Sequence, residues 1–104
     1  MQRIAFKMQL YKEQVQEYQR RHEEIWTELA ELLKNAGVED YSIFLDPGTN
    51  ALFAVLKIEN PDELNELPKH PIMQKWWKYM SDIMETNPDN SPVSIPLTEV
   101  FYLP

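Results

Sequence analysis

The hydrophobic period of the chain switches from two residues to between three and four, then back, and it does so twice. Every second residue from Ile4 to Leu10 is apolar, which is typical of a strand with one buried face. Between Gln14 and Ala36 apolar residues return every three or four positions, so this stretch predicts one long amphipathic helix. Gly37, which can adopt the left-handed conformation, is expected to end that helix.

Two alternating runs follow the predicted helix. They cover residues 41–45 and 52–58, and the turn formers at 46–50 between them predict a hairpin. A last alternating run over residues 95–103 predicts a final strand, and Pro96 marks it as an edge strand because proline cannot donate to a sheet ladder.

Prolines divide the region between the hairpin and the last strand. Pro61 suits the first turn of a helix, Pro68 interrupts that helix, and Pro71 suits a second start. Residues 87–92 carry two prolines among turn formers, so they predict a loop. We therefore expect a second helical region in two pieces, followed by a defined loop.

The predicted order is strand, helix, strand, strand, helix, strand. Two such halves joined by a hairpin make a ferredoxin-like βαββαβ arrangement, an α+β fold whose antiparallel sheet carries both helices on one face. The 104 residues suffice for one domain, residues 1–104. Because the central strand is apolar on both faces, we expect a second copy of the chain to cover the open face, which gives a homodimer of the dimeric α/β barrel type.

Composition narrows the function classes. The chain has 17 acidic and 10 basic residues and a formal net charge of −7, the wrong sign for binding nucleic acid. It has no cysteine, two histidines and two glycines, so thiol chemistry is excluded, and a histidine-rich metal centre or a glycine-rich phosphate loop is hard to build. No stretch reads as a secretion signal or a membrane span, and we expect a cytoplasmic protein.

His22 stands out in the first predicted helix. It lies in the middle of the apolar stripe, four residues after Tyr18, where packing alone favours leucine or isoleucine. One interpretation is a core histidine that a neighbouring group satisfies by a hydrogen bond, and for a lone inward-facing histidine this is the better starting assumption. The other is a general acid or base in a cavity, because imidazole titrates near working pH.

The aromatic residues suggest a pocket. Trp76 and Trp77 are adjacent on the second predicted helix, so they point about 100° apart and cannot both be buried on one narrow stripe. Tyr18 shares a helix face with His22, and the hydroxyl of Tyr41 would be costly to bury without a partner. Aromatic rings that pack on the C–H faces of a pyranose, with tyrosine and histidine hydrogen bonds to its hydroxyls, would make a sugar pocket.

Six segments spread along the chain form a recognisable set: Tyr18–His22, Ile25–Trp26, Asp40–Tyr41, Trp76–Met80, Asn87–Pro92 and Glu99–Leu103. Each segment alone is weak, but the set, in this order and in a chain of this length, is specific. Together the segments resemble the L-rhamnose mutarotase family, and the resemblance runs over nearly the whole chain.

The resemblance implies a cofactor-free isomerase of the racemase and epimerase class, which exchanges the α and β anomers of L-rhamnopyranose in rhamnose metabolism. It implies His22 as proton donor. It further implies Tyr18, Tyr41, Trp76 and Trp77 as substrate-binding residues, no metal, and a homodimer.

Two other functions would fit the same fold. A cofactor-free monooxygenase of the dimeric α/β barrel type shares the architecture and a histidine-lined pocket, and a non-catalytic sugar-binding module shares the aromatic residues. Anomer exchange, oxygen uptake, and binding without exchange are the observations that separate the three hypotheses.

Overall fold

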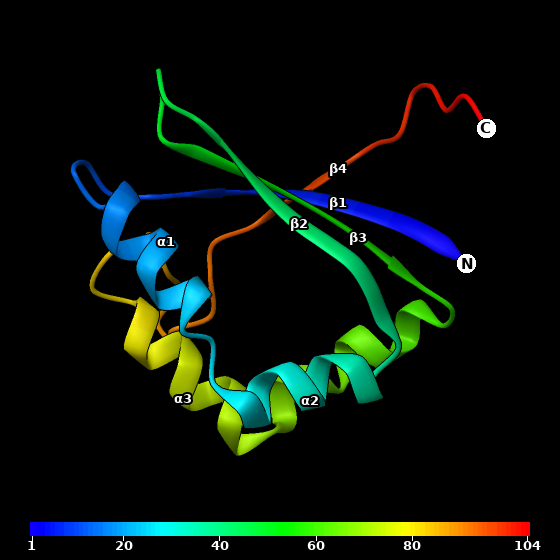
Figure 1. Ribbon diagram of the computed structural model, residues 1–104, viewed down its shortest axis with the longest axis horizontal. Coiled ribbons are helices and arrows are strands. Elements are labelled where there is room, and N and C mark those ends of the chain that lie inside the picture. The colour runs from blue at the N-terminus through cyan, green and yellow to red at the C-terminus, as the bar shows by residue number, and fades with distance from the viewer.

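The computed structural model describes residues 1–104 and contains one four-stranded antiparallel sheet (Figure 1). The strands are β1 (Gln2–Gln9), β2 (Val38–Asp46), β3 (Ala51–Ile58) and β4 (Ile95–Leu97). They stand in the order β2–β3–β1–β4, so the first strand lies beside the third and the last strand forms an edge. This order is that of the predicted ferredoxin-like fold.

The helical segments lie on one face of the sheet (Figure 1). They are α1 (Val15–Glu23), α2 (Thr27–Asn35), α3 (Pro71–Met80) and two short 3₁₀ helices, η1 (Pro61–Asn65) and η2 (Leu67–Lys69). The prolines act as predicted, because each of these last three segments carries one in its first turn. None of the helices has the length and apolar composition needed to cross a membrane.

The prediction of one long helix over residues 14–36 is wrong, because the chain breaks between α1 and α2. Trp26 has an extended backbone, with φ −62° and ψ 133°, and α2 begins after it. Its indole packs against Trp76 and Tyr79, with ring centroids 5.1 and 5.4 Å away. The apolar spacing does not reveal this break, since both short helices present their apolar sides to the same core. Gly37 ends the second helix with φ +90°, as predicted.

The last strand is shorter than the predicted run to residue 103. β4 ends at Leu97, and residues 98–104 form no regular element (Figure 1). This tail keeps contact with β1 through Arg3, which pairs with Glu99 at 3.8 Å and lies over the Tyr102 ring at 4.4 Å. Val100, Phe101 and Leu103 are all more than three-quarters exposed, so their spacing reflects no pairing within the chain. Pro96 lies in an edge strand as expected.

The core lies between the sheet and the helices. β3 shows the alternation most clearly: Leu52, Ala54, Leu56 and Ile58 are buried on the helix side. The residues between them are only partly buried on the opposite face, and Phe44, which pairs with Phe53 there, is 61% exposed. The expected apolar open face is therefore present on the single chain.

Candidate active site

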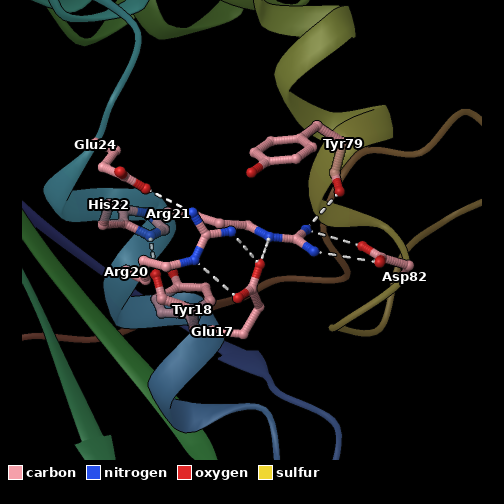
Figure 2. A network of polar contacts seen from close by, with 8 residues as sticks. All are labelled: Glu17, Tyr18, Arg20, Arg21, His22, Glu24, Tyr79 and Asp82. Atoms are coloured by element: carbon pink, nitrogen blue, oxygen red, sulfur yellow. Dashed lines mark hydrogen bonds and ion pairs between the residues drawn. The ribbon is translucent and has the colours of Figure 1, made fainter.

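α1 places Tyr18 and His22 one turn apart on the same side of the helix. The Nδ1 atom of His22 lies 3.0 Å from the backbone carbonyl oxygen of Tyr18 (Figure 2). A carbonyl oxygen can only accept a hydrogen bond, so Nδ1 must carry the proton. In the neutral imidazole, Nε2 is then the unprotonated nitrogen, free to accept a proton from another group.

Aromatic rings surround the imidazole of His22. The Tyr18 ring lies 4.3 Å from it at a tilt of 31°, and Trp76 from α3 meets it edge-on at 5.4 Å. Burial among these rings lowers the pKa of His22 below its ordinary 6.5, and the hydrogen bond to the Tyr18 carbonyl opposes that shift only in part. The imidazole is therefore held mainly neutral at pH 7.

A bulge in β2 brings Tyr41 to the cavity side of the sheet. Between Glu39 and Ser42 the strand has one more residue than its partner β3, and Asp40 takes a left-handed backbone with φ +48°. Without a bulge, Val38 and Tyr41 would point to opposite faces of the sheet. The extra residue reverses the alternation, so Tyr41 and Ile43 point to the same face as the buried Val38. The sequence pattern predicts the face of Tyr41 correctly but gives no sign of this bulge.

Both tyrosines keep their protons at neutral pH. Tyr41 leaves 38% of its surface open to solvent, yet its hydroxyl lies among protein atoms, and this desolvation raises its pKa to about 12. Burial also raises the pKa of Tyr18, and the proximity of the Tyr41 oxygen raises it further. Two phenols that stay protonated can donate hydrogen bonds to a ligand oxygen.

One cavity brings all five predicted site residues together. It has a volume of about 1490 Å³, lies between the helices and the sheet, and is lined by Tyr18, His22, Tyr41, Trp76 and Trp77. Trp76 is buried in the core and Trp77 is half-buried beside it, so both indoles border the same space despite their different directions. A largely apolar wall with a few polar groups is typical of a small-molecule site.

The cavity wall also carries polar residues that sequence reasoning did not select. Asp40 lines it from the β2 bulge, and Asn87 and Ser91 line it from the proline-rich loop. That loop is held by its own hydrogen bonds, since the Asn87 N–H donates to the Ser91 carbonyl at 2.7 Å and the Ser91 N–H to the Asp89 carboxylate at 3.0 Å. Its proline spacing predicted a loop, but nothing local placed the loop at the wall of this cavity.

His70 lies apart from this site. It is exposed at the start of α3 and does not line the cavity, in keeping with its position before Pro71. No group of three or more histidine, aspartate and glutamate side chains is arranged to hold a metal ion. The chemistry that the cavity offers is thus proton transfer at one imidazole, with phenol donors beside it.

Comparison with known proteins decides which family has this arrangement. The sequence profile of L-rhamnose mutarotase matches residues 3–103. This chain belongs to the L-rhamnose mutarotase family. Among its relatives, the L-rhamnose mutarotase of Formosa agariphila is 54% identical over 103 residues, 99% of each chain, and that of a Jannaschia species is 54% identical over the full length of both.

Solved structures agree with the family assignment. The crystal structure of an L-rhamnose mutarotase from Formosa agariphila matches with a TM-score of 0.93 at 53% identity, and each chain is covered completely. A dimeric ferredoxin-like protein from an uncultured marine organism matches with a TM-score of 0.57 at 11% identity, over 97% of this chain and 96% of the other, which supports the fold alone. Membership of the L-rhamnose mutarotase family favours an isomerase over the monooxygenase and the binding module.

Proposed function

We propose that this protein exchanges the α and β anomers of L-rhamnopyranose by acid–base-assisted opening and closing of the sugar ring. The observation that carries the proposal is the neutral imidazole of His22 in the cavity: its Nδ1 proton is bound to the Tyr18 carbonyl, and Nε2 is left without a partner inside the protein. Family membership supplies the sugar.

Ring opening requires the anomeric hydroxyl to lose a proton while the bond from C1 to the ring oxygen breaks and that oxygen gains a proton. Nε2 of His22 accepts the proton of the anomeric hydroxyl, and the imidazolium gives that proton to the ring oxygen as the bond from C1 to this oxygen breaks. When the ring closes, Nε2 takes the proton of the attacking hydroxyl and the imidazolium gives it to the aldehyde oxygen, which becomes the anomeric hydroxyl again. The proton-donor role that the resemblance implies is thus the second half of one cycle, since catalysis in both directions uses the same group as base and as acid.

Between opening and closing, the aldehyde turns about the C1–C2 bond and offers its other face to the hydroxyl that closes the ring. The cavity, at about 1490 Å³, leaves room for this rotation. We assign Tyr18 and Tyr41 as hydrogen-bond donors to sugar oxygens, because their raised pKa values keep both hydroxyls protonated. Trp76 and Trp77 provide apolar surface for the C–H face of the sugar.

Magnetisation transfer between the two anomeric protons of L-rhamnose tests the function directly. Saturating one signal should reduce the other in the presence of catalytic amounts of protein, and the transfer should disappear in a His22→Gln variant that stays folded by circular dichroism. Wild-type protein that leaves the exchange rate at its value in water would refute the proposal. Binding without exchange would favour the sugar-binding module, and oxygen uptake with a quinol would favour the monooxygenase.

We also propose that two copies of the chain form a homodimer through the open face of the sheet. Phe44 and Phe53 lie side by side on that face, and the exposed apolar residues Val100, Phe101 and Leu103 extend from the strand at its edge. Sedimentation velocity should give twice the 12.4 kDa of one chain. Replacing Phe44 by Lys should yield a single-chain species, and an unchanged mass would contradict this interface.

A cytoplasmic location and a part in rhamnose metabolism complete the proposal. The part in rhamnose metabolism rests on membership of the L-rhamnose mutarotase family. Cell fractionation followed by anomer-exchange assays on each fraction tests the location. Activity recovered outside the cytoplasmic fraction would contradict it.

A further inference from the structure

We propose that Arg21 is a positioning residue for the proton-transfer site: it locks α1 to the end of α3, so that His22 and Trp76 keep the separation that leaves Nε2 facing the cavity. This inference rests on the proposed function, because it assigns Arg21 a part in the same reaction. Arg21 does not line the cavity and makes no hydrogen bond to His22. It acts through α1, the helix that it shares with His22.

Arg21 is the one charged or polar residue among the buried side chains, at 8% exposure. Its Nε donates to the Glu17 carboxylate at 2.7 Å, its Nη1 to the Tyr79 carbonyl at 2.7 Å and to Asp82 at 2.9 Å, and its Nη2 to the other oxygen of Asp82 at 3.3 Å (Figure 2). A buried guanidinium is tolerated only when it is paired and hydrogen-bonded in this way. Four of the five N–H groups of Arg21 are hydrogen-bonded within the protein, and the residue does not line the cavity, so we assign it no substrate contact.

These bonds join two helices that are far apart in sequence. Glu17 belongs to α1, whereas Tyr79 lies in the last turn of α3 and Asp82 just after it. The Tyr79 carbonyl is one of the four at the end of a helix that lack a partner within the helix, so Arg21 caps α3. The forked contact with Asp82 adds a fixed orientation, which a single point charge could not supply.

A line of aromatic contacts leads from Arg21 back to His22. The guanidinium lies over the Tyr79 ring at 4.3 Å, and Tyr79 stacks on Trp26 at 5.4 Å. Trp26 meets Trp76 edge-on at 5.1 Å, and Trp76 meets His22 edge-on at 5.4 Å. Arg21 and His22, at the two ends of this series of contacts, are neighbours in α1. A shift of Arg21 would therefore reach His22 both along the α1 backbone and through the aromatic contacts.

Arg20 offers a matched control on the same helix. It is also an arginine with acidic partners, and its ion pairs run to Glu17 and Glu24. Its side chain is 52% exposed and reaches α3 only through the side chain of Tyr79, whereas the bonds to the Tyr79 carbonyl and to Asp82 belong to Arg21. Removing its charge should leave the spacing between α1 and α3 intact. We call the bonds of Arg21 to the Tyr79 carbonyl and to Asp82 the clamp between α1 and α3. The comparison of Arg21 with Arg20 therefore separates the loss of the clamp from the loss of one positive charge.

The test uses Arg21→Met and Asp82→Asn, with Arg20→Gln as control, in the full-length protein. We expect Arg21→Met to lower kcat for anomer exchange by about 100-fold with KM changed less than threefold, since small misplacements of reacting groups carry costs of that order. Asp82→Asn should lower kcat by about 10-fold. The Asp82 side chain is 66% exposed, so this substitution should not prevent folding. Arg20→Gln should stay within twofold of wild type.

The pH profile distinguishes positioning from a purely structural role. Both clamp variants should move the acid limb of kcat, because the imidazole is no longer held at the same depth among its aromatic neighbours. A variant that melts at a lower temperature yet keeps the wild-type kcat and pH profile while folded would overturn the inference. If Arg21→Met fails to fold, Asp82→Asn decides alone, and unchanged kcat and pH profile in that variant overturn it too.

The outcome is separable from the proposed function. If wild-type protein exchanges no anomers, the proposed function fails, and the clamp is then judged by the nitrogen chemical shifts of His22. Shifts that change in Arg21→Met and Asp82→Asn but not in Arg20→Gln support a positioning role. Shifts that are the same in all four proteins refute it.

Discussion

The ionisable groups on the two sides of α1 have opposite surroundings: those toward the cavity lack charged partners, and those on the other side have them. Toward the cavity, Tyr18 and His22 have lost water without gaining a charged partner, and their pKa values move toward the neutral forms, upward for the phenol and downward for the imidazole. On the other side, Arg21 is as buried as Tyr18 but has acidic partners, and the pKa of Glu17 falls to about 2 because Arg20 and Arg21 bind its carboxylate.

The difference shows how one short helix separates reactivity from placement. The charged side has many fixed partners and little freedom, which suits a residue that holds two helices together. The cavity side has one fixed contact, at Nδ1 of His22, and leaves Nε2 for a ligand. Changes on the cavity side should therefore affect chemistry first, and changes on the charged side should affect geometry or stability.

Removal of the imidazole should have the largest effect. His22→Gln should reduce the rate of anomer exchange by about 10² to 10⁴-fold, the usual contribution of one positioned acid or base, while the fold persists. Magnetisation transfer at saturating L-rhamnose measures the loss. His70→Gln is the matched control, because His70 is exposed and outside the cavity, and it should exchange anomers at the wild-type rate. Near-wild-type exchange in His22→Gln would make His22 a structural residue.

Removal of the phenol hydroxyls should have an intermediate effect. Tyr18→Phe and Tyr41→Phe keep the rings, including the contact of Tyr18 with the imidazole at 4.3 Å, but each removes one donor. We expect kcat/KM to fall by about fivefold in each, in line with about 1 kcal/mol for a neutral hydrogen bond. Titration of the exchange rate against L-rhamnose gives both constants. Values unchanged in both variants would take the tyrosines out of the binding site.

Lowering the pH should affect both activity and stability through His22. Its pKa is below 6.5 in the folded protein, so exchange should be steady above that pH and decline as the imidazole becomes protonated at lower pH. Below pH 6.5 the unfolded chain binds a proton that the folded one still excludes, so this contribution to stability is lost as the pH falls from 6.5 through the folded pKa. Urea unfolding of wild type and His22→Gln at pH 7 and pH 5 measures it. The same pH dependence in both proteins would contradict the assignment.

The smallest effect should come from the exposed charges. Arg20→Gln removes ion pairs that solvent and salt screen, and we expect the unfolding midpoint to move by no more than about 2 °C. Thermal unfolding followed by circular dichroism measures the shift. A shift as large as that of Arg21→Met would mean that the outer charges and the buried arginine stabilise the protein alike.

Periodicity sufficed to predict most of the fold. The switches between alternating and helical spacing predicted the strands, the hairpin and the ferredoxin-like order, and the prolines predicted the division of the second helical region. The break at Trp26 and the bulge at Asp40 were not predictable in this way. Both depend on contacts formed only in the folded chain: an indole packed against α3 in one case, and the register between β2 and β3 in the other.

The candidate site was predictable for a different reason. His22 interrupts an apolar stripe, and two adjacent tryptophans cannot share one, so each is conspicuous within its own helix. The contact of Arg21 with Asp82 gives no such signal, since the two residues are 61 positions apart and each alone resembles an ordinary surface charge. A sequence pattern marks residues that conflict with their local surroundings, and it does not mark those that a distant partner satisfies.

Nitrogen-15 NMR of the His22 ring tests the contrast between the two sides of α1 most directly. A pH titration of the folded protein reports both the pKa and the nitrogen that carries the proton in the neutral form. We predict the Nδ1–H tautomer with a pKa below 6.5. An Nε2–H tautomer, or a pKa of 6.5 or above, would contradict the view that the cavity holds a neutral imidazole with Nε2 ready to accept a proton.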